Sequence, residues 1–191
     1  MTLPPVIRIF FAIDLPAETK ERLSQFIGVL KKRSKSNGIR WTKPENLHIT
    51  LQFLAEAKTE HITAMLEKVR QHVLGVFKVS ELTFGSLHLF PNPYRPRVIV
   101  MDVNPQEALA ALSGSIGEVI ATFGYELEHR SFRAHLTLGR IKQPHRADLA
   151  FITEYTASDI ESIPVREVAL FRSEPMPEGS CYTVVDRIAL G

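Results

Sequence analysis

The sequence predicts an α+β fold with two similar sheet-and-helix lobes, which are related by a pseudo-twofold axis and face each other across a central cleft. Three observations lead to this prediction. The segment RIFFAIDLP (8–16) resembles RVIVMDVNP (97–105), and a helical pattern follows each of them. An H-x-T tripeptide occurs once in each half in a strand-like setting, at His48 and at His135, 87 positions apart (135 − 48). Two landmarks that repeat at nearly one offset indicate two related halves, each alternating strands with helices.

The first half is expected to form a strand, a helix, a strand and a second helix. The apolar run from Val6 to Ile13 is too short to cross a membrane and favours a strand. Helical spacing of apolar residues follows at 17–35 and again at 59–75. Between these helices, apolar and polar residues alternate around His48 and Thr50, as in a half-buried strand. The two side chains are therefore expected on one face, roughly 7 Å apart along the backbone.

The second half is expected to repeat this order after the strand at 97–105. The further elements expected there are a helix at 106–123, a strand at 132–138, a helix at 146–156 and a last strand from Cys181 to Leu190. The turn-rich segment FPNPYRP (90–96) predicts a hinge between the halves, and SEPMPEG (173–179) occupies the matching place near the C-terminus. No linker-like segment separates the halves, so the prediction is one domain, 1–191, with sequence halves of roughly 1–95 and 96–191.

The letters H-I-T also occur at residues 61–63, in a different setting. Apolar residues around them recur with helical spacing, which turns His61 and Thr63 about 200° apart. These two side chains cannot act on one ligand, so His61 is interpreted as a surface residue of a helix. Only the strand-borne pairs, His48 with Thr50 and His135 with Thr137, can each present both side chains to one ligand.

Composition excludes several classes of protein. The chain is 45% hydrophobic and 23% charged, as in an ordinary soluble globule. Its single cysteine, Cys181, leaves no internal disulfide and too few thiols for a zinc or iron–sulfur cage, which fits a reducing, cytoplasmic setting. H-E-x-x-H, Walker A and G-x-G-x-x-G motifs are absent from the sequence, so neither a metal nor a cofactor is expected. The distribution of apolar residues predicts no membrane-spanning segment. It also shows no heptad repeat that would call for an oligomer, so a monomer is expected.

Charge is distributed unevenly although the net charge is only +2. No acidic residue occurs from Arg22 to Pro44, which holds seven lysines or arginines, or from His129 to Ala147, which holds five. Each window lies beside or around an H-x-T strand. Two basic windows at the same kind of motif predict an anionic partner.

Two histidines on opposite sides of a phosphate can divide the work of acid–base catalysis. With ordinary pKa values near 6.5, one imidazole can be neutral and the other charged at neutral pH. The neutral one can take a proton from water while the charged one protonates a leaving oxygen. Two threonine hydroxyls can donate to the phosphate oxygens. A strained cyclic phosphodiester suits this arrangement because its leaving oxygen stays tethered.

ENLHITLQFL (45–54) and FRAHLTLGRI (132–141), together with FFAIDLP (10–16), resemble the 2H phosphoesterase superfamily over nearly the whole chain. The most similar group is the RNA 2′,3′-cyclic phosphodiesterases, also known as 2′-5′ RNA ligases. The resemblance implies a bilobal α+β fold that opens RNA 2′,3′-cyclic phosphates to 2′-phosphomonoesters without a metal. It implies the following roles: His48 protonates the 3′ leaving oxygen, His135 activates water, Thr50 and Thr137 hold the phosphate, and Arg140 adds a cationic contact.

The sequence leaves some alternatives open. The family usually has Pro where this chain has Ala134. In a regular strand Arg133 shares the face of His135 and Arg140 does not, unless Gly139 hosts a bulge. Phe11 and Trp41 are candidates to stack on a base.

Three readings of the function also remain open. Besides hydrolysis of RNA ends, the alternatives are a phosphodiesterase for a small cyclic nucleotide and a non-catalytic RNA- or nucleotide-binding module. Joining of RNA ends through a 2′-5′ linkage is a further possible reaction, since a tethered cyclic phosphate can accept a hydroxyl in place of water.

Overall fold

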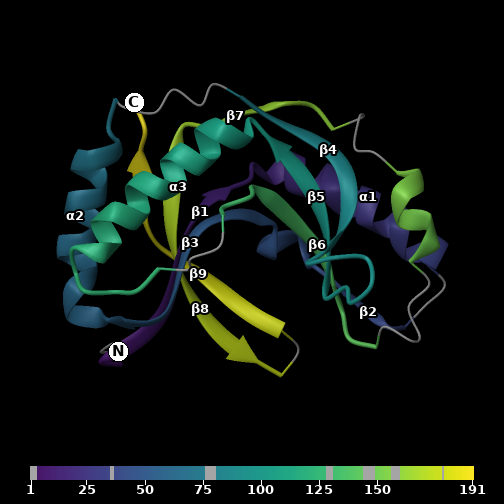
Figure 1. The fold of residues 1–191 in the computed structure, drawn as a ribbon, viewed down its shortest axis with the longest axis horizontal. Coiled ribbons are helices and arrows are strands. Elements are labelled where there is room, and N and C mark those ends of the chain that lie inside the picture. Colours follow the sequence, from purple (N-terminus) through teal and green to yellow (C-terminus); the bar gives the residue numbers. More distant parts are fainter. Residues whose placement is uncertain are drawn as a thin grey trace.

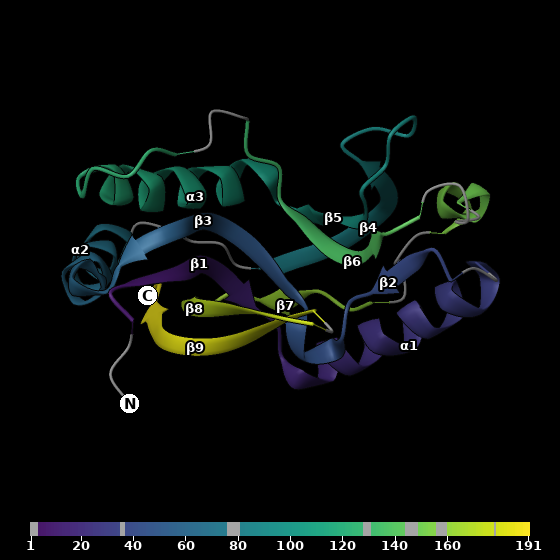
Figure 2. The same ribbon diagram turned by 90° about the horizontal axis from the view of Figure 1, so that it is seen from below.

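The computed structural model of the chain describes residues 4–34, 37–75, 81–127, 131–143, 149–155, 160–177 and 179–191. Two antiparallel sheets lie in the middle of the molecule, and the helices lie outside them (Figures 1 and 2). The four-stranded sheet has the order β3 (His48–Lys58), β1 (Val6–Asp14), β8 (Glu167–Met176), β9 (Gly179–Ala189). The five-stranded sheet has the order β2 (Ile39–Trp41), β6 (His135–Ile141), β5 (Val98–Asn104), β4 (Glu81–Phe90), β7 (Ile163–Pro164). The predicted α+β class is confirmed.

Three α-helices are present in the part of the chain that the structure describes. They are α1 (Ala17–Ser34), α2 (Ile62–Val73) and α3 (Gln106–Ala121), and they match the three helices predicted at 17–35, 59–75 and 106–123. Short 3-10 helices occupy Pro44–Asn46, Thr59–His61 and Ala150–Glu154. In Figure 2, α3 crosses over β3 and α1 runs beside β2.

The prediction of a helix at 146–156 is wrong for residues 149–155, the part of this range that the structure describes. Only a short 3-10 helix, Ala150–Glu154, is found there, and residues 144–148 and 156–159 lie outside the described ranges. The adjacent residues Phe151 and Ile152 are both buried. A single 3-10 turn is enough to bury Phe151 and Ile152. β-branched residues such as Ile152 also have a lower helix propensity, which disfavours a longer helix.

The two sheets do not coincide with the two halves of the sequence. From the first half, β4 pairs with β5 of the second half and β2 pairs with β6. In return, β8 of the second half pairs with β1 of the first. One continuous core of buried apolar residues combines both halves, for example Ile9 and Ile49 with Val168 and Leu170. Each sheet therefore contains strands from both halves of the sequence.

The hinge predicted at 90–96 is therefore wrong. This segment is the loop of the β4–β5 hairpin, where the Arg97 amide donates to the Phe90 carbonyl at 2.8 Å. In its counterpart, Ser173–Met176 are the last residues of β8 and are paired with the start of β9. Prolines and asparagines mark a hairpin loop and a hinge alike. Only the pairing of the flanking strands distinguishes the two.

The start of β6 is fixed by a side chain of α3. The Ala134 amide donates to Gln106 Oε1 at 2.9 Å, and Gln106 Nε2 donates to the carbonyls of Ala134 at 2.8 Å and Val103 at 2.7 Å. A proline at position 134 would have no N–H for the first of these bonds. This chain thus holds the residue before His135 with a glutamine rather than with a rigid ring.

We expect Gln106→Ala to lower the free energy of unfolding by about 1–3 kcal/mol, because three hydrogen bonds are lost and partly buried backbone groups lose their partner. Urea denaturation at neutral pH measures the change. Glu107→Ala, an exposed change in the same helical turn, is the matched control and should cost only a few tenths of a kcal/mol. Equal effects of the two changes would show that the contact of Gln106 with Ala134 does not stabilise the fold.

Candidate active site

The first H-x-T motif lies on β3 beside a β-bulge. Ala12 of β1 is paired with Thr50, but the preceding residue, Phe11, is paired with Gln52, so that Leu51 is an extra residue in β3. An extra residue reverses the alternation of side chains in the rest of a strand. His48 and Thr50 therefore share their face with Phe53, three residues beyond Thr50.

The second motif lies on β6 and has the same irregularity. Val100 of β5 is paired with Thr137 and Ile99 with Gly139, which leaves Leu138 as the extra residue. Beyond the bulge, the face of His135 and Thr137 is continued by Arg140. The bulge considered for Gly139 is thus present, with Leu138 as its inserted residue.

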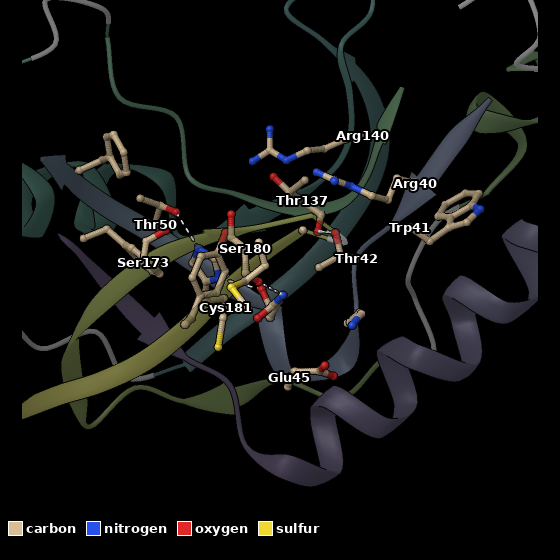
Figure 3. Close-up of a pocket in the computed structure, with 18 of the residues that line it drawn as sticks. Arg40, Trp41, Thr42, Glu45, Thr50, Thr137, Arg140, Ser173, Ser180 and Cys181 are labelled. Atoms are coloured by element: carbon tan, nitrogen blue, oxygen red, sulfur yellow. Dashed lines mark hydrogen bonds between the residues drawn. The ribbon is translucent and has the colours of Figure 1, made fainter. Parts of the chain in front are cut away.

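The two H-x-T strands meet at one cleft of about 690 Å³. β3 and β6 belong to different sheets and contact each other. Both histidines, both threonines and Arg140 line this cleft. Figure 3 shows Thr50 on one side and Thr137 with Arg140 on the other. The predicted convergence of the two motif strands on a central cleft is confirmed.

Both histidines are oriented by the same backbone contact. Nδ1–H of His48 donates to the carbonyl of Asn46, and Nδ1–H of His135 donates to the carbonyl of Arg133, each at 2.8 Å. In both cases the acceptor lies two residues before the histidine. Since a carbonyl can only accept, the proton on Nδ1 leaves Nε2 as the atom available for chemistry. In His48 this atom lies 3.0 Å from Thr50 Oγ1.

Aromatic rings enclose His48. Its ring centroid lies 4.7 Å from that of Phe10, 5.2 Å from Tyr182 and 6.1 Å from Phe171. Burial lowers the pKa of His48 from 6.5 to about 4, although the hydrogen bond to Asn46 opposes the shift. The His48 imidazole is therefore neutral near pH 7, and Nε2 accepts from the Thr50 hydroxyl. His135 is partly buried, and its ring stacks on Phe90 at 5.8 Å.

A carboxylate lies across the strand pair from each histidine. Asp14 is paired with His48 and Asp102 with His135. Lys20 and Arg187 bind Asp14 at 2.7 and 2.8 Å. Burial raises the pKa of the Asp14 carboxyl, but the hydrogen bonds and charges of these two cations outweigh it and hold the pKa below its ordinary value.

Arg133 and Arg140 have different surroundings. Arg133 Nη2 binds Asp102 Oδ1 at 2.7 Å, and Arg133 is absent from the cleft lining. His88 shares that carboxylate, at 2.6 Å from Asp102 Oδ2. Arg140 reaches into the cleft from beyond the bulge. The geometry therefore favours Arg140 as the cation for a ligand in the cleft.

Phe11 and Trp41, the two residues predicted to stack on a base, differ in whether they reach the cleft. Phe11 is only 1% exposed and packs in the core, so its prediction as a substrate contact is wrong. Its neighbour Phe10 points to the opposite face and lines the cleft instead. Residues 9–13 are all apolar, so alternation could not tell which of the two faces the ligand. Trp41 does line the cleft, and its contact with a base stays a prediction.

Several lining residues were not identified from the sequence. Arg40, Thr42 and Lys43 reach the cleft from β2 and the turn after it, and Tyr182 from β9. The acid-free window from Arg22 to Pro44 was the only signal for the two cations. It did not single out Arg40, because β2 has only three residues and pairs with a strand about 100 positions away.

Neither a metal-binding cluster nor a membrane-spanning helix is found among the residues that the structure describes. Among them, no group of three or more histidine, cysteine, aspartate or glutamate side chains is placed to hold a metal ion. The helices formed by these residues are too short or too polar to cross a membrane.

Comparison with known proteins places this site in a family. The chain matches the family described as LigT like Phosphoesterase over residues 13–100 and again over 101–182. A protein of Archaeoglobus fulgidus named RNA 2′,3′-cyclic phosphodiesterase is 31% identical over 92% of this chain and 96% of its own.

Two solved structures are similar in fold. The crystal structure of TT0787 of Thermus thermophilus has a TM-score of 0.79 at 25% identity, over 96% of this chain and 98% of that one. The structure of E. coli LigT complexed with 3′-AMP has a TM-score of 0.72 at 25% identity, over 98% of this chain and 99% of that one. The family match covers most of the residues, and in this chain it includes both H-x-T strands. The chain belongs to the LigT-like phosphoesterase family.

Proposed function

We propose that this protein hydrolyses RNA 2′,3′-cyclic phosphate ends to 2′-phosphomonoesters without a metal. One observation carries the proposal: two H-x-T strands from different sheets line a single cleft together with Arg140. The activity named for the Archaeoglobus relative and the 3′-AMP in the E. coli LigT structure support the same class of substrate.

In the proposed reaction, the two histidines move two protons. His135 Nε2 takes a proton from water, and the water oxygen forms the new bond to phosphorus. The bond from phosphorus to the 3′ oxygen breaks, and that oxygen receives the proton from His48 Nε2. The histidines thereby exchange protonation states and must reset before the next turnover. Each proton transfer is typically worth about 10²–10⁴ in rate.

The phosphate itself would be held by uncharged donors and one cation. The hydroxyls of Thr50 and Thr137 reach the cleft from opposite sides and can donate to non-bridging oxygens. Arg140 can neutralise the charge that builds up on those oxygens.

The proposed role of His48 as proton donor requires that substrate changes its charge state. In the free protein its low pKa leaves the ring without the proton to be donated. A phosphodiester anion beside Nε2 would favour the imidazolium form and raise the pKa. We therefore propose that His48 gains its proton together with the substrate.

Two alternatives are distinguished by substrate. A phosphodiesterase for a small cyclic nucleotide would use the same histidines but gain nothing from a longer RNA. A binding module would hold the ligand and release it unchanged. A 2′-5′ ligation would need a ribose hydroxyl in the place of water, and we include it as a side reaction of the same centre.

Replacing either His48 or His135 by Ala should lower turnover about 10²–10⁴-fold, because each change removes one proton transfer. The assay uses a short RNA ending in a 2′,3′-cyclic phosphate, in EDTA, with the product analysed for 2′- or 3′-phosphate. His61→Ala is the matched control, since it alters the same tripeptide at the end of the 3-10 helix Thr59–His61, outside the cleft lining. Full activity of the His48 variant would exclude the two-histidine mechanism. A 3′-phosphate product would reverse the proposed orientation of the substrate.

Arg140→Ala should lower kcat/KM by about 10² or more, as expected for loss of a charged donor to the reacting phosphate. Arg133→Ala should have a much smaller effect, because its guanidinium is bound to Asp102 outside the cleft. The same RNA assay compares the two variants. A larger loss for Arg133→Ala would exchange their proposed roles.

The His48 ring should titrate near pH 4 in the free protein and at a higher pH with an anion bound. Burial disfavours the imidazolium, whereas inorganic phosphate in the cleft favours it, so the pKa must rise on binding. NMR of the His48 ring Cε1–H, recorded against pH with and without phosphate, measures both values. An unchanged pKa at saturating phosphate would contradict the idea that His48 gains its proton with the substrate.

A further inference from the structure

We infer that Arg40, which stands beside Arg140, forms a second anion subsite that binds the phosphodiester immediately upstream of the cyclic phosphate. This inference rests on the proposed function and deepens it, because it gives the cleft a contact that an RNA strand of two or more nucleotides can make and a mononucleoside cyclic phosphate cannot.

The two arginines lie directly opposite each other on paired strands. Arg40 of β2 is the register partner of Arg140 of β6. Opposed residues of an antiparallel pair point to the same face, with Cβ atoms about 4.5–5.5 Å apart. Both side chains line the cleft, and Figure 3 shows them extending side by side above Thr137 and Thr42.

Directly opposed like charges are unfavourable in a sheet unless a counter-charge is present. Among the described residues, no carboxylate lies within ion-pair distance of either guanidinium: the ion pairs found within that part of the chain involve other side chains. Glu45, the single carboxylate of the described cleft lining, lies well away from both in Figure 3. Arg40 is also partly buried, which increases the benefit of a bound anion.

The count of charges points to more than one phosphate. A cyclic phosphodiester carries one negative charge, which Arg140 alone can balance. The cleft lining adds two further cations, Arg40 and Lys43. In an RNA strand, the next negative charge is the phosphodiester that joins the terminal nucleotide to its neighbour, and arginine side chains commonly bind such backbone phosphates.

The test compares wild type with Arg40→Gln, which removes the charge of Arg40, on each of two substrates. The substrates are a mononucleoside 2′,3′-cyclic phosphate and a trinucleotide with the same terminal nucleotide. For Arg40→Gln, we expect the ratio of kcat/KM on the trinucleotide to that on the mononucleotide to fall about tenfold, through KM rather than kcat. The slope of log KM against log salt for the trinucleotide should decrease by about one. Lys58→Gln, an exposed change at the far end of β3, is the control for loss of a charge.

A binding measurement separates this inference from the proposed function. Wild type and Arg40→Gln are titrated with a trinucleotide ending in a 2′-phosphate and with the corresponding 2′-mononucleotide. If Arg40→Gln loses more affinity for the trinucleotide than for the mononucleotide, each loss being measured against wild type, the subsite is supported even if no turnover is seen. An equal loss of affinity for both ligands would overturn it, because Arg40 would then contact only the terminal phosphate. An unchanged affinity for both would overturn it as well.

Discussion

The pairing of β1 with β3, and of β5 with β6, contains one extra residue at the same place in each half, just after the H-x-T threonine. If Leu51 and Leu138 were regular strand residues rather than bulges, alternation would turn Phe53 and Arg140 away from the histidines. With the bulges, each half presents three cleft-lining positions on one face. In a regular strand, Arg140 would lie on the face opposite His135. The bulge brings it to the cleft, where it lies beside the reacting phosphate in the proposed mechanism.

The backbone of the two half-sites is equivalent, but their side chains are not. The position of Arg140 on β6 is taken by Phe53 on β3. Phe10, Phe171 and Tyr182 then make the surroundings of His48 aromatic and partly shielded from water. Such surroundings keep an imidazole neutral until an anion arrives, whereas the cationic side of the cleft attracts that anion. A symmetric scaffold can thereby give two identical residue types different surroundings.

Exchange of strands between the halves fixes the cleft. β4 and β8 each complete the sheet of the other half, and one apolar core joins the two sheets. Moving the two H-x-T strands apart would therefore expose buried side chains such as Ile49 and Leu136. The positions of the two histidines thus depend on the packing of the whole core, and in the proposed mechanism such preorganisation favours catalysis.

Local patterns in the amino-acid sequence were enough to establish the strands and helices with clear periodicity, the strand setting of His48 and His135 as against the helical setting of His61, and the excess of positive charge near both motifs. These properties depend on neighbouring residues, so a short stretch of chain carries them. The folded chain was needed to establish that Phe10 rather than Phe11 faces the cleft, that Arg40 stands opposite Arg140, and that aromatic rings surround His48. Each of these depends on the register between strands that lie far apart in the chain, and a shift of one residue would reverse every face.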